Sequence, residues 1–121
     1  MTVRKRILLA DDSNVVTTIL ATSLQKEGFD VEIAFDGQTA FELGRDGEFD
    51  LAVLDQMMPG LLGLEVIEQW HEAGVVFPVL ILTAVADETM AVQSIQLGAA
   101  DFVRKPFHLP ELIARIRSRL V

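Results

Sequence analysis

The sequence contains no cysteine and no long hydrophobic run. Without cysteine there is neither a disulfide framework nor a thiolate metal site, a composition that suits the reducing cytosol. A membrane-spanning helix needs about 20 mostly apolar residues in succession, and no segment of this chain approaches that length. The apolar run Ile7–Ala10 follows basic residues but is too short for the core of a signal peptide. We therefore expect a cytoplasmic protein with no membrane contact.

Positive charge is scarce as well. Lysine and arginine total 10 against 18 aspartates and glutamates, and the net charge of −8 argues against direct binding of nucleic acid through its phosphates. Three arginines nevertheless gather near the C-terminus, at Arg115, Arg117 and Arg119. Either they form a solvated helix face that complements the negative end of the helix dipole, or they form a docking surface for a partner. The sequence leaves both interpretations open.

Strand signals recur along the chain. The continuous apolar runs Ile7–Ala10, Leu51–Leu54 and Val79–Leu82 are typical of parallel strands that are buried on both faces. Alternation over residues 31–35 predicts a half-exposed edge strand, and Phe102–Val103 predicts a short fifth strand.

The segments between these strands have the helical period of apolar residues. The clearest stripe is the last one, at Leu109, Leu112, Ile113, Ile116 and Leu120. Helix starts are expected after the capping residues Ser13, Asp36 and Asp87, and helix ends near Gly28, Gly74 and Gly98. Alternating strands and helices without a linker or repeat predict one domain over residues 1–121, of the α/β class with helices on both faces of a sheet.

Polar residues follow the predicted strands where a functional site is expected. In an open parallel sheet, sites form at the carboxyl ends of the strands. Asp11 and Asp12 follow the first strand, Asp55 the third, Thr83 the fourth, and Lys105 comes soon after the fifth. Clustered carboxylates repel one another unless a cation neutralises them, and Mg²⁺ prefers such oxygen ligands. A carboxylate can also accept a phosphoryl group, a reaction that mainly needs positioning and charge neutralisation.

Each of these residues also has a purely structural interpretation. Asp12 is placed to be a turn residue, Thr83 to end a strand, and Lys105 to be a solvated loop charge. Taken singly, the structural interpretation is preferred for Asp12 and Thr83. Taken together, the informative strand ends all carry groups that phosphoryl transfer requires, and this favours the functional interpretation.

In this order and spacing the residues resemble the receiver domains of two-component response regulators. The resemblance extends from Ile7 to Leu120. Its motifs are the Asp11–Asp12 pair, Asp55 to Gly60 with Gly63, Thr83–Ala84, Gly98–Ala99 and Lys105–Pro106–Phe107.

The resemblance implies a flavodoxin-like three-layer α/β sandwich whose parallel five-stranded sheet has the order 2-1-3-4-5. It implies that Asp55 is the phosphoacceptor and that Mg²⁺ is the cofactor, with Mn²⁺ or Ca²⁺ as substitutes. The metal would be held by Asp12 and Asp55, by Asp11 mainly through water, and by the backbone carbonyl of Met57.

The resemblance also assigns a switch. Thr83 would bind a phosphoryl oxygen and move toward it, Phe102 would then turn inward, and Lys105 would pair with the phosphoryl group. The peptide bond before Pro106 would be cis. Phe102 has no hydroxyl, so its switching would depend on packing alone; otherwise it is an ordinary core aromatic of an edge strand.

The function implied is a phosphorylation-controlled signalling switch that takes its phosphoryl group from a sensor histidine kinase. It would catalyse its own phosphorylation and slow dephosphorylation without being an enzyme for other molecules. As the N-terminal regulatory domain of a longer protein, it would signal to an effector domain or a second copy through the fourth helix, fifth strand and fifth helix. Glu111, Arg115 and Asp101 fit the pairing pattern of that face. The uncharged residues Ala91, Gln96 and Ala100 depart from it.

Three other functions are alternatives for a chain of this kind. A phosphatase with an aspartate nucleophile would carry a second acid two residues later, where this chain has Met57. A flavin or nucleotide binder would have a glycine-rich first loop rather than two carboxylates. A receiver-like interaction module that works without phosphorylation is the main alternative, and the intact set of Asp55, Thr83 and Lys105 argues against it.

Overall fold

The chain folds around one parallel sheet. The structure, a computed structural model, describes residues 4–84 and 88–120, the side chains of residues 88–91 excepted. The strands are β1 (Arg6–Ala10), β2 (Asp30–Ala34), β3 (Leu51–Asp55), β4 (Val79–Thr83) and β5 (Asp101–Arg104). Every neighbouring pair is parallel, in the order β2-β1-β3-β4-β5. The predicted sheet order is therefore confirmed.

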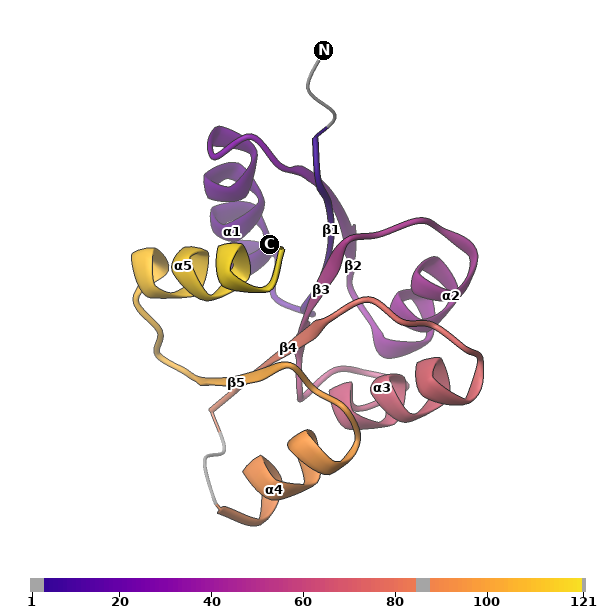
Figure 1. Ribbon diagram of the computed structural model, residues 1–121. Coiled ribbons are helices and arrows are strands. Elements are labelled where there is room, and N and C mark those ends of the chain that lie inside the picture. The colour runs from indigo at the N-terminus through magenta and orange to yellow at the C-terminus, as the bar shows by residue number, and fades with distance from the viewer. Residues whose placement is uncertain (1–3, 85–87, 121) are drawn as a thin grey trace.

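Helices alternate with the strands and cover both faces of the sheet. They are α1 (Asn14–Lys26), α2 (Gly37–Asp46), α3 (Gly63–Glu72), α4 (Glu88–Gln96) and α5 (Leu109–Arg119). Figure 1 shows α1 and α5 on one side of the sheet, and α2, α3 and α4 on the other. This arrangement is the predicted flavodoxin-like three-layer sandwich. Within the part of the chain that the structure describes, no helix has the length and apolar content needed to cross a membrane.

The sheet separates two hydrophobic clusters, and β1 contributes to both. Ile7 and Leu9 pack into the cluster beneath α1 and α5, whereas Leu8 and Ala10 pack into the cluster beneath α2 and α3. All four side chains are buried. A central strand with both faces covered must be apolar at every position, which explains why its sequence is a continuous apolar run.

Local capping sets where the helices begin. The Ser13 hydroxyl accepts a hydrogen bond from the Val16 backbone N–H at 3.3 Å, and an Asp36 carboxylate oxygen accepts one from the Thr39 N–H at 2.7 Å. Both predicted N-caps are thus confirmed, whereas the predicted cap Asp87 lies outside the described residues. The predicted glycines Gly28, Gly74 and Gly98 have positive φ angles just after the ends of α1, α3 and α4.

The edge strand β2 is shifted by one residue from the predicted span, residues 31–35, and begins at Asp30. It ends at Ala34, which is buried beneath α2, and the next residue, Phe35, is 46% exposed. The position at the edge of the sheet is confirmed. The expected alternation fails at this end of the strand because α2 covers the face on which Ala34 lies.

A close contact joins α2 to α3. Gly44 of α2 faces the indole ring of Trp70, and a Cβ atom added at Gly44 would collide with that ring. The Trp70 Nε1–H donates a hydrogen bond of 2.9 Å to the backbone carbonyl of Phe41, and the Trp70 side chain is buried. Phe77 packs edge-on against Trp70, with the ring centroids 5.0 Å apart. This contact fixes the C-terminal half of α3 against α2.

We expect the substitution Gly44→Ala to destabilise the domain because the new methyl group must displace the buried ring of Trp70. The expected loss in the free energy of unfolding is about 1–3 kcal/mol, the usual cost of overpacking a core. Urea denaturation followed by far-ultraviolet circular dichroism measures it. Thr22→Ala, at an exposed position of α1, is the control and should stay within about 0.5 kcal/mol of the parent. Equal stability of the two variants would contradict a tight contact between α2 and α3.

Candidate functional site

The parallel sheet brings the predicted site residues to one edge. Asp55 and Thr83 are the last residues of β3 and β4, and Asp11 follows directly after β1. Lys105 follows directly after β5, and its backbone N–H donates a hydrogen bond of 2.8 Å to the carbonyl of Thr83. All these strands run in the same direction, so their carboxyl ends lie on the same side of the molecule.

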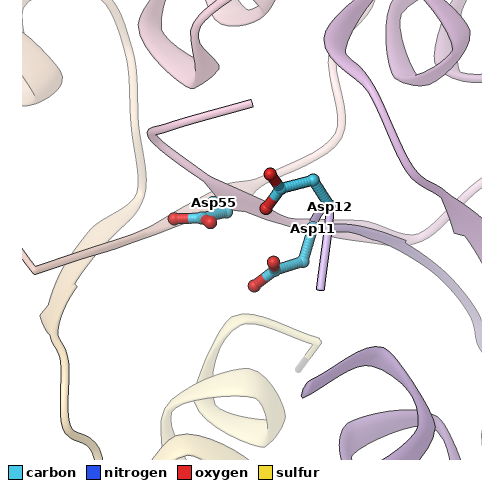
Figure 2. A group of neighbouring side chains, drawn as sticks. All are labelled: Asp11, Asp12 and Asp55. Atoms are coloured by element: carbon cyan, nitrogen blue, oxygen red, sulfur yellow. The ribbon is translucent and has the colours of Figure 1, made fainter. Parts of the chain in front are cut away.

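Three carboxylates form the centre of this site. Asp11, Asp12 and Asp55 each offer an oxygen atom, and these atoms all lie within 4.8 Å of one another. Figure 2 shows the three side chains gathered where β1 and β3 end. Asp11 is 1% exposed and Asp55 is 6% exposed, whereas Asp12 is open to solvent. The cluster therefore reaches from the interior to the surface.

Lys105 is the cation of the site. Its Nζ lies 3.2 Å from Asp11 Oδ2 and 3.1 Å from Asp55 Oδ2. The other oxygen of Asp11 accepts a hydrogen bond of 3.0 Å from the backbone N–H of Ser13, which fixes this carboxylate against the start of α1. The Lys105–Pro106 peptide bond is cis, the isomer that the resemblance implies.

The electrostatics of the site perturb two of its groups. Burial raises the pKa of the Asp55 carboxyl above its usual range, and the charge of Asp11 raises it further. Lys105 and a hydrogen bond from the Met57 backbone act in the opposite direction without cancelling this effect. For Lys105, burial alone would lower the pKa, but the charges of Asp55 and Asp11 outweigh it and the pKa of the ammonium is raised.

The donor set fits a hard divalent cation. Three carboxylates against one ammonium leave an excess of negative charge, and neighbouring carboxylates are unfavourable unless a cation neutralises them. Carboxylate and carbonyl oxygens are the ligands that Mg²⁺, Mn²⁺ and Ca²⁺ prefer. Because Asp12 is exposed, the cluster can be reached from solvent.

Two of the predicted residues lie at the margin of the cluster. Thr83 is fully buried at the end of β4, and Phe102 is partly buried in β5, the neighbouring strand. Phe102 packs against the hydrophobic cluster on the side of α2, α3 and α4, together with Leu97 and Ala99. The Met57 side chain is 57% exposed. Phe102 is therefore a core aromatic of an edge strand in this conformation, with its backbone beside the strand that carries Thr83.

The C-terminal arginines are largely engaged within the chain. Arg115 lies 2.9 Å from Asp101 and 3.0 Å from Glu111, and Arg117 lies 2.7 Å from Glu27. The predicted partners Asp101 and Arg115 thus pair inside one molecule. These contacts favour the interpretation of the arginines as a solvated helix face.

One residue of the site region was not predicted from the sequence. Gln56, directly after Asp55, is only 3% exposed, and its Oε1 accepts a hydrogen bond of 2.9 Å from the backbone N–H of Leu64. The position of Gln56 in the sequence does not indicate that it is buried, because a glutamine between a strand and a helix is usually a solvated loop residue. A polar residue directly before two methionines was the available hint.

Comparison with known proteins identifies the family. The response regulator receiver domain matches residues 7–117 of this chain. The response regulator MprA of Mycolicibacterium vanbaalenii is 44% identical over 115 residues, which cover 95% of this chain and 50% of that protein. The alkaline phosphatase synthesis transcriptional regulatory protein PhoP of Bacillus subtilis is 40% identical over 116 residues, which cover 96% of this chain and 48% of that protein. The chain thus spans about half the length of these relatives.

Solved structures agree with this result. The receiver domain of the Francisella response regulator 1452 superimposes with a TM-score of 0.93 at 30% identity, over 97% of each chain. A CheY-like response regulator receiver domain protein from Methanospirillum hungatei gives a TM-score of 0.92 at 28% identity, over 98% of this chain and 94% of that one. The resemblance noted from the sequence motifs is confirmed, and the chain belongs to the response regulator receiver domain family.

Proposed function

We propose that this receiver domain is a phosphorylation-controlled switch in which Asp55 accepts a phosphoryl group from a sensor histidine kinase in a Mg²⁺-dependent reaction. The observation that carries the proposal is the environment of Asp55. Its carboxylate lies at the end of β3, within 3.1 Å of the Lys105 ammonium and beside Asp11 and Asp12. The site therefore combines three groups at one place. These are a nucleophile, a cation that is placed to meet a phosphoryl oxygen, and a set of donors for a metal ion.

The metal would be held by Asp11, Asp12, Asp55 and the backbone carbonyl of Met57. When bound, Mg²⁺ supplies positive charge to the carboxylates and to the oxygens of the phosphoryl group. Two contacts already hold the carboxylate of Asp11 in place, one from the Ser13 backbone and one from Lys105. Asp12 is exposed and adds the remaining carboxylate from the solvent side.

In the transfer step, a carboxylate oxygen of Asp55 forms a bond to phosphorus while the bond from phosphorus to the histidine nitrogen of the kinase breaks. The nitrogen keeps the electron pair of the broken bond. Lys105 carries its proton throughout, because its pKa is raised, and its charge pairs with the transferred group. The Thr83 hydroxyl donates to a phosphoryl oxygen. The domain acts on itself, so it is a phosphoacceptor rather than an enzyme that turns over other molecules.

Phosphorylation would change the α4-β5-α5 face. Thr83 ends β4, and Phe102 lies in the adjacent strand β5, so that a shift of Thr83 changes the space available to the aromatic ring. An Asp101 carboxylate oxygen accepts a hydrogen bond of 2.8 Å from the Phe102 N–H and also pairs with Arg115. The backbone of Phe102 is thereby tied to α5. Phosphorylation then biases a pre-existing conformational equilibrium toward the state that a partner binds.

The partner of this face would be an effector domain or a second copy of the domain. The relatives that are called transcriptional regulators are about twice as long as this chain, which supports an effector region elsewhere in the whole protein. We place this domain at the N-terminus of that protein and the protein in the cytoplasm. The uncharged residues Ala91 and Gln96 on α4 make a charge-paired dimer the less favoured of the two. With its excess of acidic residues, the domain itself is not proposed to bind nucleic acid.

Incubation with acetyl phosphate and Mg²⁺ should add one phosphoryl group to the domain, because a receiver can use a small phosphodonor without its kinase. Intact-mass spectrometry should show a single adduct that is absent with Asp55→Asn and absent when the metal is chelated. No adduct, with Mg²⁺ binding shown separately, would contradict the proposal and indicate an interaction module that works without phosphorylation.

The affinity of the domain for Mg²⁺ should fall on acidification. The fall should begin at a higher pH than it would in a metal site whose aspartates have the usual pKa. Asp55 must lose its proton to serve as a ligand, and its pKa lies above the usual value for aspartate, about 4. Protons therefore compete with the metal while most surface carboxylates are still ionised. Calorimetric titration with MgCl₂ at several pH values between about 5 and 8 measures this. A constant affinity down to the acidic end of that range would count against a metal site that includes Asp55.

Asp55→Asn should stabilise the metal-free domain at neutral pH. A pKa that is raised in the folded state means that ionised Asp55 opposes folding, and this cost appears as the pH rises through that pKa. The melting temperature of the metal-free Asp55→Asn domain should therefore lie above that of the parent. Thermal unfolding in a chelator tests it, and the gain should vanish near pH 4, where the carboxyl is protonated. Asp12→Asn, at the exposed position, should change stability less because water screens its charge.

A further inference from the structure

Gln56 is a buried polar residue beside the phosphoacceptor that has no place in the mechanism above. It is 3% exposed. Its backbone N–H donates a hydrogen bond of 2.8 Å to the carbonyl of Leu82, which continues the pairing of β3 with β4 one residue beyond Asp55. A polar side chain is buried at such a position only when it finds partners there.

The partners of Gln56 are the first residues of α3. Its backbone carbonyl accepts a hydrogen bond of 3.0 Å from the Gly63 N–H, and its side-chain Oε1 accepts one of 2.9 Å from the Leu64 N–H. The residue at the N-cap of α3 is Leu62, whose side chain has no acceptor. Gln56 therefore supplies, from the end of a strand, the capping interaction that a helix normally receives from its own N-cap residue.

The start of α3 is also packed directly on the strand end. A Cβ atom added at Gly63 would lie 2.8 Å from the carbonyl oxygen of Asp55 and 3.1 Å from Gln56 Oε1. Only a glycine fits at this distance. The end of β3, the side chain of Gln56 and the start of α3 thus form one tightly packed unit.

Residues 57–62 form a loop that this unit closes. Both ends of the loop are held by Gln56, and its middle is held by a hydrogen bond of 3.0 Å from the Gly37 N–H to the carbonyl of Pro59. Met57 is the first residue of the loop, and its backbone N–H is hydrogen-bonded to the Asp55 carboxylate. The direction of the Met57 carbonyl therefore depends on where Gln56 holds the loop.

We propose that Gln56 is a positioning residue for the Met57 backbone carbonyl and thereby sets the affinity of the site for Mg²⁺. The inference deepens the proposed function and rests on it, since it concerns the same metal site. Gln56 does not touch the reacting atoms. It keeps the Met57 carbonyl in the orientation that metal binding requires, so that binding does not have to order the loop.

The first test compares the parent domain with Gln56→Leu, whose side chain has a similar volume but no acceptor for the Leu64 N–H. Calorimetric titration with MgCl₂ at neutral pH should show an affinity about tenfold weaker, in the range found when an outer partner of a metal ligand is lost. Hydrogen exchange of the Leu64 amide, followed without metal, should become faster. An unchanged affinity would overturn the proposal. If Gln56→Leu does not fold, Gln56→Met is measured in its place.

Two further variants separate positioning from a general loss of stability. Gln56→Glu retains an acceptor, so it should restore slow exchange at Leu64 and bind Mg²⁺ at least as tightly as the parent; weak binding like that of Gln56→Leu would overturn the proposal. Gly44→Ala loosens the contact between α2 and α3 without touching Gln56. Its Mg²⁺ affinity should stay within about twofold of the parent, a much smaller change than the loss of affinity expected when a residue that positions a metal ligand is replaced. An equal loss in Gly44→Ala would assign the effect to stability and overturn the proposal.

The failure of the proposed function would look different. In that case the parent domain itself would show no Mg²⁺ binding that depends on Asp55, and both proposals would fall together. If the parent binds Mg²⁺ and only the effect of Gln56→Leu is absent, the proposed function stands and the role of Gln56 is excluded.

Discussion

The parallel pairing of the central strands is the constraint on which the rest of the structure depends. Because β1, β3, β4 and β5 run in one direction, every strand delivers its last residues to the same edge. Side chains separated by as many as 94 positions in the chain, Asp11 and Lys105, come within 3.2 Å of one another in this way. The same pairing buries both faces of the sheet, which explains the apolar strands and the need for helices on either side.

This geometry imposes an electrostatic cost that the site itself partly relieves. Carboxylates placed side by side in a poorly solvated edge repel one another. Burial, and then the charge of Asp11, raises the pKa of Asp55. Lys105 reduces the cost by contacting both Asp11 and Asp55. The excess negative charge that remains would favour the binding of a divalent cation. The proposed function therefore opposes stability at this edge, a conflict that is common at functional sites.

Much of the fold could be predicted because its determinants are local. Continuous apolar runs indicate buried strands, and Ser13 and Asp36 are capping residues that need only their immediate neighbours. The gathering of the site residues followed from topology alone, since any parallel sheet brings its strand ends together. Their roles in phosphoryl transfer and metal binding stay predictions until the chemistry is measured.

What could not be predicted depends on contacts between distant elements. The sequence does not show that α2 buries Ala34 and leaves Phe35 exposed, because alternation cannot say which face a helix will cover. It does not show that Arg115 pairs with Asp101 inside one molecule rather than between two. Gln56 is the clearest case, since its role appears only when the start of α3 has folded back onto the end of β3.

The burial of Trp70 has a practical consequence for spectroscopy. It is the only tryptophan of the chain, and its indole N–H is bonded to the backbone of α2 rather than to water. Its emission should therefore be that of a dry, rigid indole, shifted to shorter wavelength, and should change when α2 and α3 separate. The domain thus contains an intrinsic optical probe of its helical layer, distinct from the acidic edge where ligands would act.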